Sequence, residues 1–164
     1  MALPTKILPG FSATLYAQPS ATPTPLTVSN LAVYASVSAL AISGNLVPVE
    51  AIPAFGQDDA VASFGVAGSR QSDKIPVQSA PTSMTITAAW NPSDTVLLLL
   101  RGDAYNGTID RTFVIQATDG TGIVCYAFNG RVSQWQIDSA PGAEAKVTFT
   151  IHPRGNQYGW SAST

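Results

Sequence analysis

Residues 83–90 read Ser-Met-Thr-Ile-Thr-Ala-Ala-Trp, and apolar and polar side chains alternate along them. A second stretch, residues 145–152, reads Ala-Lys-Val-Thr-Phe-Thr-Ile-His and alternates in the same way. Alternation with a period of two is typical of antiparallel strands that have one buried face. We therefore predict a mainly β fold whose core includes the large apolar members of both stretches: Trp90, Val147, Phe149 and Ile151.

Five further segments have the composition of strands, namely residues 11–18, 31–42, 111–118, 122–128 and 131–138. Asp119-Gly120 lies between two of them and predicts a tight hairpin turn. Asn129-Gly130 admits two interpretations, a second turn or a bulge that bends one long strand from residue 123 to residue 138. We favour the bulge, because the flanking segments together look like one strand that changes sheets.

One helix is predicted directly after the alternating residues 83–90. Asn91 is placed as the capping residue, Pro92 suits the first helical position, and Asp94 adds an acid to the first turn. We expect Arg101-Gly102 to end the helix, because a basic residue and a glycine are common at that end. The four leucines at 97–100 cover more than one face, so one side should pack on a sheet and leave another to a neighbouring subunit.

The 164 residues suffice for one domain, and we treat residues 1–164 as a single unit with an extended N-terminal arm at about 1–10. Charged residues make up 11% of the chain, against about 25% in typical soluble domains. The formal charge of −2 excludes strong electrostatic attraction to nucleic acid or to a membrane. A monomer with so few charges would be poorly soluble, so we infer that other copies cover much of its surface.

The composition also excludes several kinds of site. One histidine and one cysteine cannot make a zinc cage, a disulfide framework or a CxxC redox site within one chain. His152 and Cys125 lack a third group at a suitable spacing, as a nucleophile and its base would need. Adjacent residues of an extended chain point to opposite sides, so Asp58-Asp59 does not predict a convergent carboxylate pair. We expect no enzyme activity, no metal and no cofactor.

Three short patterns have structural explanations. Arg101-Gly102-Asp103 spells an adhesion tripeptide, but it falls at the expected helix end. Asn106-Gly107-Thr108 matches a glycosylation acceptor without any sign of secretion. A stacking platform for sugars or bases could be built from Trp90, Trp135 and Trp160. Trp90 continues a buried face, however, whereas Trp135 alternates with Arg131 and Ser133 and is expected on an outer or inter-subunit face.

Residues 50–81 form the longest segment without clear periodicity, and we expect a long loop there. Loops of this length inside a compact domain are usually functional or disordered. The segment combines two phenylalanines with charges of both signs, which a passive linker would avoid. We predict that it docks on another copy of the chain through Phe55, Asp58, Asp59, Phe64, Arg70, Asp73 and Lys74.

The start of the chain lacks a basic region followed by an apolar one, as a signal peptide would have. The longest apolar stretch, residues 31–42, is too short and too polar to span a bilayer. We therefore expect synthesis in a cytoplasm and no membrane partner.

A series of strand, helix, hairpin and bend motifs follows in a fixed order along about residues 83–155. They are Thr85-Ile-Thr-Ala-Ala-Trp-Asn-Pro92, Gly107-Thr-Ile-Asp-Arg-Thr-Phe-Val-Ile115, Asp119-Gly-Thr121, Tyr126-Ala-Phe-Asn-Gly-Arg-Val-Ser133 and Ala145-Lys-Val-Thr-Phe-Thr-Ile151. This order resembles the tail tube (major tail) proteins of long-tailed bacteriophages with non-contractile tails, and the resemblance rests on the set of motifs rather than on one diagnostic residue.

The resemblance implies an antiparallel β-sandwich flanked by one α-helix. Subunits of this family form hexameric rings in which the inner strands close into one barrel, and the rings stack into a hollow tube. The long loop and the N-terminal arm would contact the adjacent ring, and double-stranded DNA would pass down the lumen. Implied partners are the tail tip and tail terminator proteins, with assembly in the host cytoplasm and a final place in the virion tail. A chain of this length would lack the immunoglobulin-like domain that many relatives add.

Other functions fit the same composition. One alternative is a monomeric β-sandwich that binds a ligand such as a carbohydrate through its tryptophans. Another is a different phage ring protein, such as a tail terminator or a baseplate ring. The inner tube of a contractile secretion system is a third.

Overall fold

The computed structural model describes residues 12–24, 26, 37–65, 72–118 and 122–162; for residues 12, 57–80 and 156–162 it describes the course of the backbone. The predicted N-terminal arm at residues 1–10 and the turn at Asp119-Gly120 lie outside these ranges. The elements are β1 (Ser12–Ala17), η1 (Ser43–Asn45), β2 (Leu46–Val47), β3 (Val49–Ala51), β4 (Gln57–Gly65), β5 (Ser72–Pro81), β6 (Met84–Ala89), α3 (Thr95–Asn106), β7 (Asp110–Thr118), β8 (Ile123–Asp138) and β9 (Lys146–Ala162).

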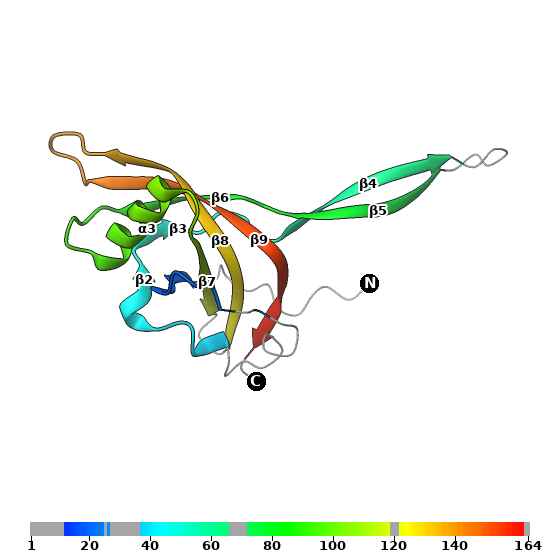
Figure 1. The fold of residues 1–164 in the computed structure, drawn as a ribbon, viewed down its shortest axis with the longest axis horizontal. Helices are drawn as coiled ribbons and strands as arrows, with labels where there is room; N and C mark the ends of the chain where they lie inside the picture. The colour runs from blue at the N-terminus through cyan, green and yellow to red at the C-terminus, as the bar shows by residue number, and fades with distance from the viewer. Residues whose placement is uncertain (1–11, 25, 27–36, 66–71, 119–121, 163–164) are drawn as a thin grey trace, which may run out of the picture.

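Seven strands form one antiparallel sheet in the order β2-β1-β7-β8-β9-β6-β3. The long strands β8 and β9 sweep round in a curve, so that the sheet nearly closes on itself with α3 at one side (Figure 1). This confirms the mainly β class with a flanking helix. The two layers of the expected sandwich are parts of a single hydrogen-bonded sheet, because β8 and β9 are long enough to belong to both.

Irregular register bends the β8–β9 pair in two regions. Ser133 pairs with Thr150 and Gln136 with Thr148, so β8 holds an extra residue there, and Gln134 has a φ of 57°. Further along, β9 holds extra residues around Gly155, whose φ is 75°. An unpaired residue on one strand bends it and increases its twist, which is how a flat ladder becomes a curved one.

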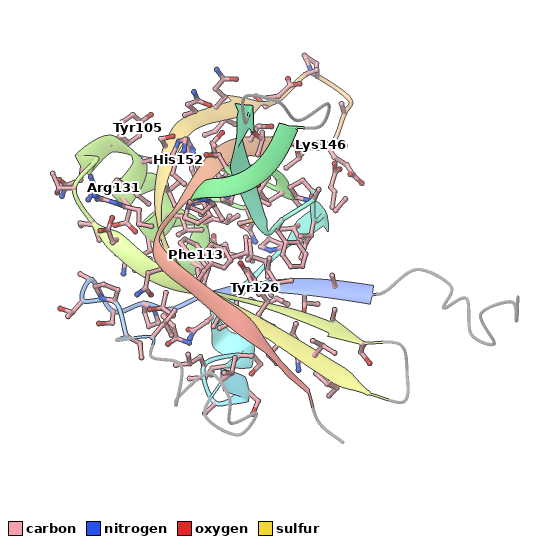
Figure 2. All side chains as sticks on the ribbon, turned by 90° about the vertical axis from the view of Figure 1, so that its right-hand side faces the viewer. Tyr105, Phe113, Tyr126, Arg131, Lys146 and His152 are labelled. Carbon is pink, nitrogen blue, oxygen red and sulfur yellow. The ribbon has the colours of Figure 1, made fainter. Side chains whose placement is uncertain are left out.

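The main core lies between the concave side of this sheet and α3. Side chains from six strands and the helix meet there, and Phe113 and Tyr126 lie inside the body (Figure 2). Of the residues predicted for the core, Val147, Phe149 and Ile151 are fully buried. Trp90 lies just beyond the end of β6 and is half-buried against the same cluster.

A second, smaller core covers the other face of β7 and β8. Val114, Cys125 and Ala127 are buried there under Val37, with Leu26 and Leu40 packed around them. These two strands are therefore buried on both faces, and β7 shows five consecutive buried residues from Arg111 to Ile115. Val37 itself lies in a helical turn in which the N–H of Leu40 donates to the Val37 carbonyl (3.1 Å). The predicted strand at residues 31–42 is thus wrong for residues 37–40, and residues 31–36 lie outside the described ranges.

Helix α3 begins later and ends later than predicted. Asp94, not Asn91, is the N-cap, and its carboxylate accepts hydrogen bonds from the N–H groups of Val96 (2.9 Å) and Leu97 (3.1 Å). The helix continues through Gly102 to Asn106 and ends at Gly107, whose φ of 66° suits glycine. The continuation brings Asp103 to the buried guanidinium of Arg111, in a helix that tolerates a mid-helix glycine at a cost of roughly 1 kcal/mol.

Asn129-Gly130 lies inside one continuous strand, β8, which spans the predicted residues 123–138. A second turn at this position is therefore excluded. The extra residue of β8 lies at Gln134 instead, and Gly130 has a different role. A Cβ at position 130 would lie 3.0 Å from Ile151 Cγ2 and 3.2 Å from the carbonyl oxygen of His152, so a larger residue would need β9 to shift by a few tenths of an ångström.

Candidate functional site: the projecting hairpin

Strands β4 and β5 form a two-stranded hairpin that projects far from the body (Figure 1). The expectation of a long irregular loop at residues 50–81 is therefore wrong for most of its length. The strands pair from Gln57 with Pro81 to Gly65 with Ser72, with one irregularity between Ala60 and Val61. Their sequence shows no regular alternation, which is why the two strands were not predicted.

The exposed edges are the chemically important feature of this hairpin. Among the described residues, β4 and β5 pair with each other and with no third strand. An isolated two-stranded hairpin is marginally stable in water, and its outer edges carry rows of unpaired N–H and C=O groups. Such a segment is suited to being covered by another chain.

The first side of the hairpin root is anchored in the main core. The Phe55 ring packs on Tyr126, with ring centroids 5.2 Å apart and planes inclined by 42°. Gly56 follows with a φ of 141°, which strongly favours glycine, and its carbonyl accepts from the N–H of Thr82 (3.1 Å). Phe55 therefore belongs to the body rather than to the projecting part, where the prediction had placed its contact.

The second side of the root is attached through His152, which lies in β9 (Figure 2). Its Nδ1 lies 2.9 Å from the hydroxyl of Ser83, which follows the hairpin directly, and its Nε2 lies 2.7 Å from the hydroxyl of Ser133 in β8. A hydroxyl can donate or accept a hydrogen bond, so both contacts fit either tautomer of the ring. His152 thus joins the hairpin root to the curved part of the sheet.

The other predicted contact residues are distributed along the hairpin. Asp58, Asp59 and Phe64 lie in β4, and Asp73 and Lys74 lie in β5. Asp73 is the register partner of Phe64, so the charges of β5 come near the far end, whereas Asp58 and Asp59 lie near the root. Arg70 lies outside the described residues.

The structure separates the residues of the candidate catalytic dyad. Cys125 is fully buried in the smaller core. His152 pairs with Arg131 of β8, and Arg131 is six residues along that strand from Cys125, so the two side chains are far apart. Burial raises the pKa of the Cys125 thiol, which keeps it in the unreactive protonated form. The described residues contain no group of three potential metal ligands.

The tryptophans do not form an open stacking platform. Trp135 stacks on Phe149 with centroids 5.2 Å apart and meets Trp90 edge-on at 5.9 Å, so both indoles border the main core. The expected outward position of Trp135 is therefore wrong. The bulge at Gln134 reverses the alternation and turns the next side chain inward. The side chain of Trp160 is not among those described.

The Arg101-Gly102-Asp103 tripeptide does not present an adhesive acid. Asp103 is only 2% exposed. Its carboxylate accepts hydrogen bonds from two nitrogens of Arg111, from Nη2 at 2.8 Å and from Nε. Arg111 also donates to the carbonyl of Pro19. This network connects α3, β7 and the segment after β1.

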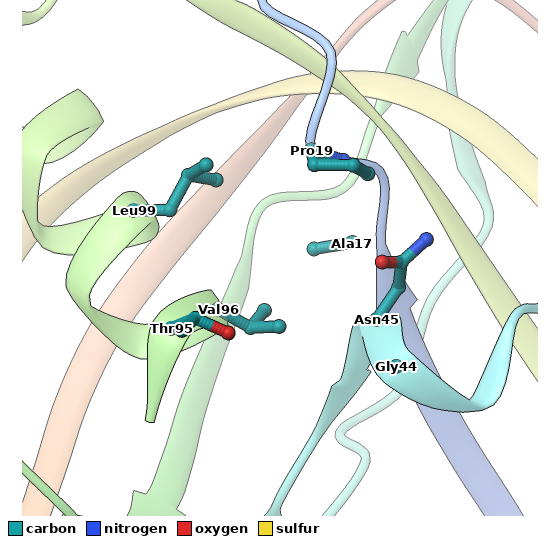
Figure 3. Close-up of a pocket in the computed structure, with 7 residues that line it drawn as sticks. All are labelled: Ala17, Pro19, Gly44, Asn45, Thr95, Val96 and Leu99. Carbon is teal, nitrogen blue, oxygen red and sulfur yellow. The ribbon is translucent and has the colours of Figure 1, made fainter. Parts of the chain in front are cut away.

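A small pocket lies between the first turns of α3 and η1 (Figure 3). Its volume is about 90 Å³, well below the roughly 300 Å³ at which ligand sites begin. Its lining carries no charged side chain and consists of Ala17, Pro19, Gly44, Asn45, Thr95, Val96 and Leu99. Among the described residues no helix has the length and apolar character that a membrane span requires.

Two solved structures are among those that share this fold. A chain in the cryo-EM structure of the anti-feeding prophage (AFP) baseplate, 6-fold symmetrised, matches with a TM-score of 0.60 and 10% identity over 99% of this chain and 97% of that one. A chain of the SPP1 tail tube, a hybrid structure from solid-state NMR and cryo-EM, matches with a TM-score of 0.54 and 10% identity over 92% of this chain and 77% of that one. No family model and no curated protein sequence matches this chain.

Proposed function

We propose that this chain is a structural, non-enzymatic component of a phage-type tail, and that it assembles into hexameric rings that stack as a tail tube. The observation that carries the proposal is the shared fold over nearly the whole chain with a subunit of a 6-fold baseplate and with one of a tail tube. At 10% identity this likeness concerns the fold, so the function rests on the surfaces described above.

The hairpin supports stacking through its chemistry. A projecting two-stranded sheet with open edges is stabilised when a neighbouring copy covers it. Its acids and bases would set the register of that contact, as opposite charges do at other interfaces. In this proposal the hairpin extends to the adjacent ring, while Phe55 and His152 hold its root.

The charge balance supports passage of DNA through such a tube. A formal charge of −2 per subunit leaves no basic excess to hold phosphate groups along the lumen. The chain would be assembled in the host cytoplasm and carried in the virion tail, with the tail tip and tail terminator proteins at the two ends of the tube.

A single baseplate ring is the second candidate. The baseplate chain has the higher TM-score of the two compared structures, and it matches this chain nearly end to end. Both candidates assemble into rings. Identical rings stack on one another in a tube, whereas a baseplate ring stays single. The two candidates therefore differ in a property that microscopy can observe.

The test is negative-stain microscopy and sedimentation of the purified chain over a wide range of concentrations. We expect rings or tubes. A chain that stays monomeric at high concentration, with or without a preformed tail tip, contradicts the proposal. Isolated rings that never stack favour the baseplate candidate.

A hairpin deletion sharpens this test. Residues 57–81 are removed and Gly56 is joined to Thr82 through a short glycine linker, which is feasible because the Thr82 N–H already donates to the Gly56 carbonyl. We expect a folded chain that forms rings without stacking. Replacing Ala21 and Thr22, two exposed residues away from the hairpin, with glycines leaves the hairpin intact and is the control. Normal tubes from the deletion variant would exclude the hairpin as the inter-ring contact.

A further inference from the structure

The outward side of α3 presents a row of exposed residues. Leu98, Gly102 and Tyr105 follow one another at intervals of four and three, so they lie on one face of the helix. Leu98 is 42% exposed and Tyr105 76% exposed, and nothing lies within 4 Å of the Cβ position of Gly102. Arg101 is exposed beside them, and no described acidic side chain forms an ion pair with it.

The turn between β8 and β9 presents the opposite charge. Ile137 is 45% exposed, and Asp138 and Glu144 are exposed beside it. Lys146 pairs with Glu50; this hydrogen bond raises the pKa of the ammonium group, and the charges of Glu50, Glu144 and Asp138 raise it further. Three acids, one of them Glu50 of β3, thus lie near one base, and these four side chains together carry a charge of −2.

These two surfaces are placed so that neighbouring copies can bring them together. Both lie at the end of the molecule opposite the projecting hairpin, so they occupy the same level along its long axis (Figure 1). Viewed along that axis, Tyr105 and Lys146 lie on different sides of the body (Figure 2). Copies related by rotation about an axis parallel to the hairpin would therefore bring the helix of one copy towards the turn of the next.

We infer that the α3 face of one copy (Leu98, Arg101, Tyr105) docks on the β8–β9 turn of a second copy (Ile137, Asp138, Glu144). The inference rests on the proposed function and names the contact within a ring. The two surfaces differ, so the interface is heterologous, and a heterologous interface closes into a ring or continues as a filament. Leu98 and Tyr105 provide the apolar contact with Ile137, while Arg101 opposite two acids sets the register.

The test is a charge exchange. Arg101→Glu and the double variant Asp138→Lys/Glu144→Lys should each raise the concentration needed for assembly about tenfold or more, since each places like charges face to face. Combining all three substitutions should restore assembly in large part. Ala21→Glu, which adds a charge at an exposed position on neither surface, is the matched control and should assemble like the parent chain.

A cross-linking experiment tests the same contact without charge changes. Tyr105→Cys and Ile137→Cys are made in separate copies, mixed before assembly and oxidised, and we expect a disulfide-linked heterodimer. The native Cys125 is fully buried and should not react. Absence of that heterodimer from assembled material, or normal assembly of Arg101→Glu, overturns this inference and leaves the proposed function standing. A parent chain that never assembles overturns both.

Discussion

Gln134 shows how one backbone torsion can redirect a large side chain. With a φ of 57° it forms an extra residue in β8, and the next residue, Trp135, turns towards Phe149 and Trp90. Regular alternation would have placed Trp135 on the side of Arg131 and Ser133. The indole Nε1 of Trp135 is buried and has no hydrogen-bond partner among the described groups.

We predict that Trp135→Phe leaves the stability unchanged or raises it by up to about 1 kcal/mol. Phenylalanine keeps the stacked ring and removes a buried donor that lacks a partner. Trp135→Ala should instead destabilise the fold by about 3–5 kcal/mol. Urea unfolding of both variants measures these differences. A clear loss in Trp135→Phe would mean that Nε1 has a partner in solution.

Phe149 occupies the centre of the main core, fully buried between β6 and β8. Phe149→Ala should lower the free energy of unfolding by about 3–5 kcal/mol, the range for removing a large core side chain. Leu46→Ala removes a large apolar side chain that is 42% exposed, so it is the control. The measurement is the thermal unfolding midpoint of each variant. Equal midpoints for the two variants would show that the inward face of β9 is assigned wrongly.

At the scale of elements, α3 is held in place by polar as well as apolar contacts. Leu97 and Leu100 are fully buried against the sheet, and Asp103 pairs with Arg111 of β7 under nearly complete burial. Burying a charge without its partner is far more costly than burying the pair. The ion pair therefore fixes where the helix lies against β7.

Removing the acid of this pair should be strongly destabilising. Asp103→Ala leaves the Arg111 guanidinium buried without a carboxylate, and we expect a loss of about 3–5 kcal/mol. Asp138→Ala, which removes an exposed acid, is the control and should change little. Replacing both Asp103 and Arg111 with leucine should recover much of the loss. If Asp103→Ala unfolds at the same urea concentration as the parent, the pair contributes nothing to stability.

At the scale of the whole molecule, the body and the hairpin have different kinds of stability. The body buries β7 and β8 on both faces and holds its strands in a nearly closed sheet. The hairpin has open edges and is attached through Phe55, the Gly56–Thr82 hydrogen bond and His152. Segments with exposed backbone hydrogen bonds open at lower free energy than a core.

Hydrogen exchange should reveal this difference. In unassembled subunits we expect fast amide exchange across β4 and β5 and slow exchange in β7 and β8. Assembly should slow exchange in the hairpin strongly, because a neighbouring copy then covers its edges. Mass spectrometry of both states, with β7 as the internal reference, makes the measurement. Equal hairpin exchange in subunits and tubes would contradict a role in stacking.

The sequence by itself determined the mainly β class, the alternating strands and the presence of one helix. It could do so because these features are local: residues 84–89 and 146–151 alternate since one face of each strand is buried against its own subunit. It also excluded a metal cage and a disulfide framework, because one histidine and one cysteine cannot build them.

Only the tertiary structure decided the features that depend on distant partners. Helix α3 extends as far as the residue that pairs with Arg111, the direction of Trp135 follows from a bulge against β9, and Gly130 lies where Ile151 approaches closely. The hairpin was missed for a related reason. Its strands form a sheet of their own, and residues 57–81 show no period of two, so their pairing becomes visible only in three dimensions.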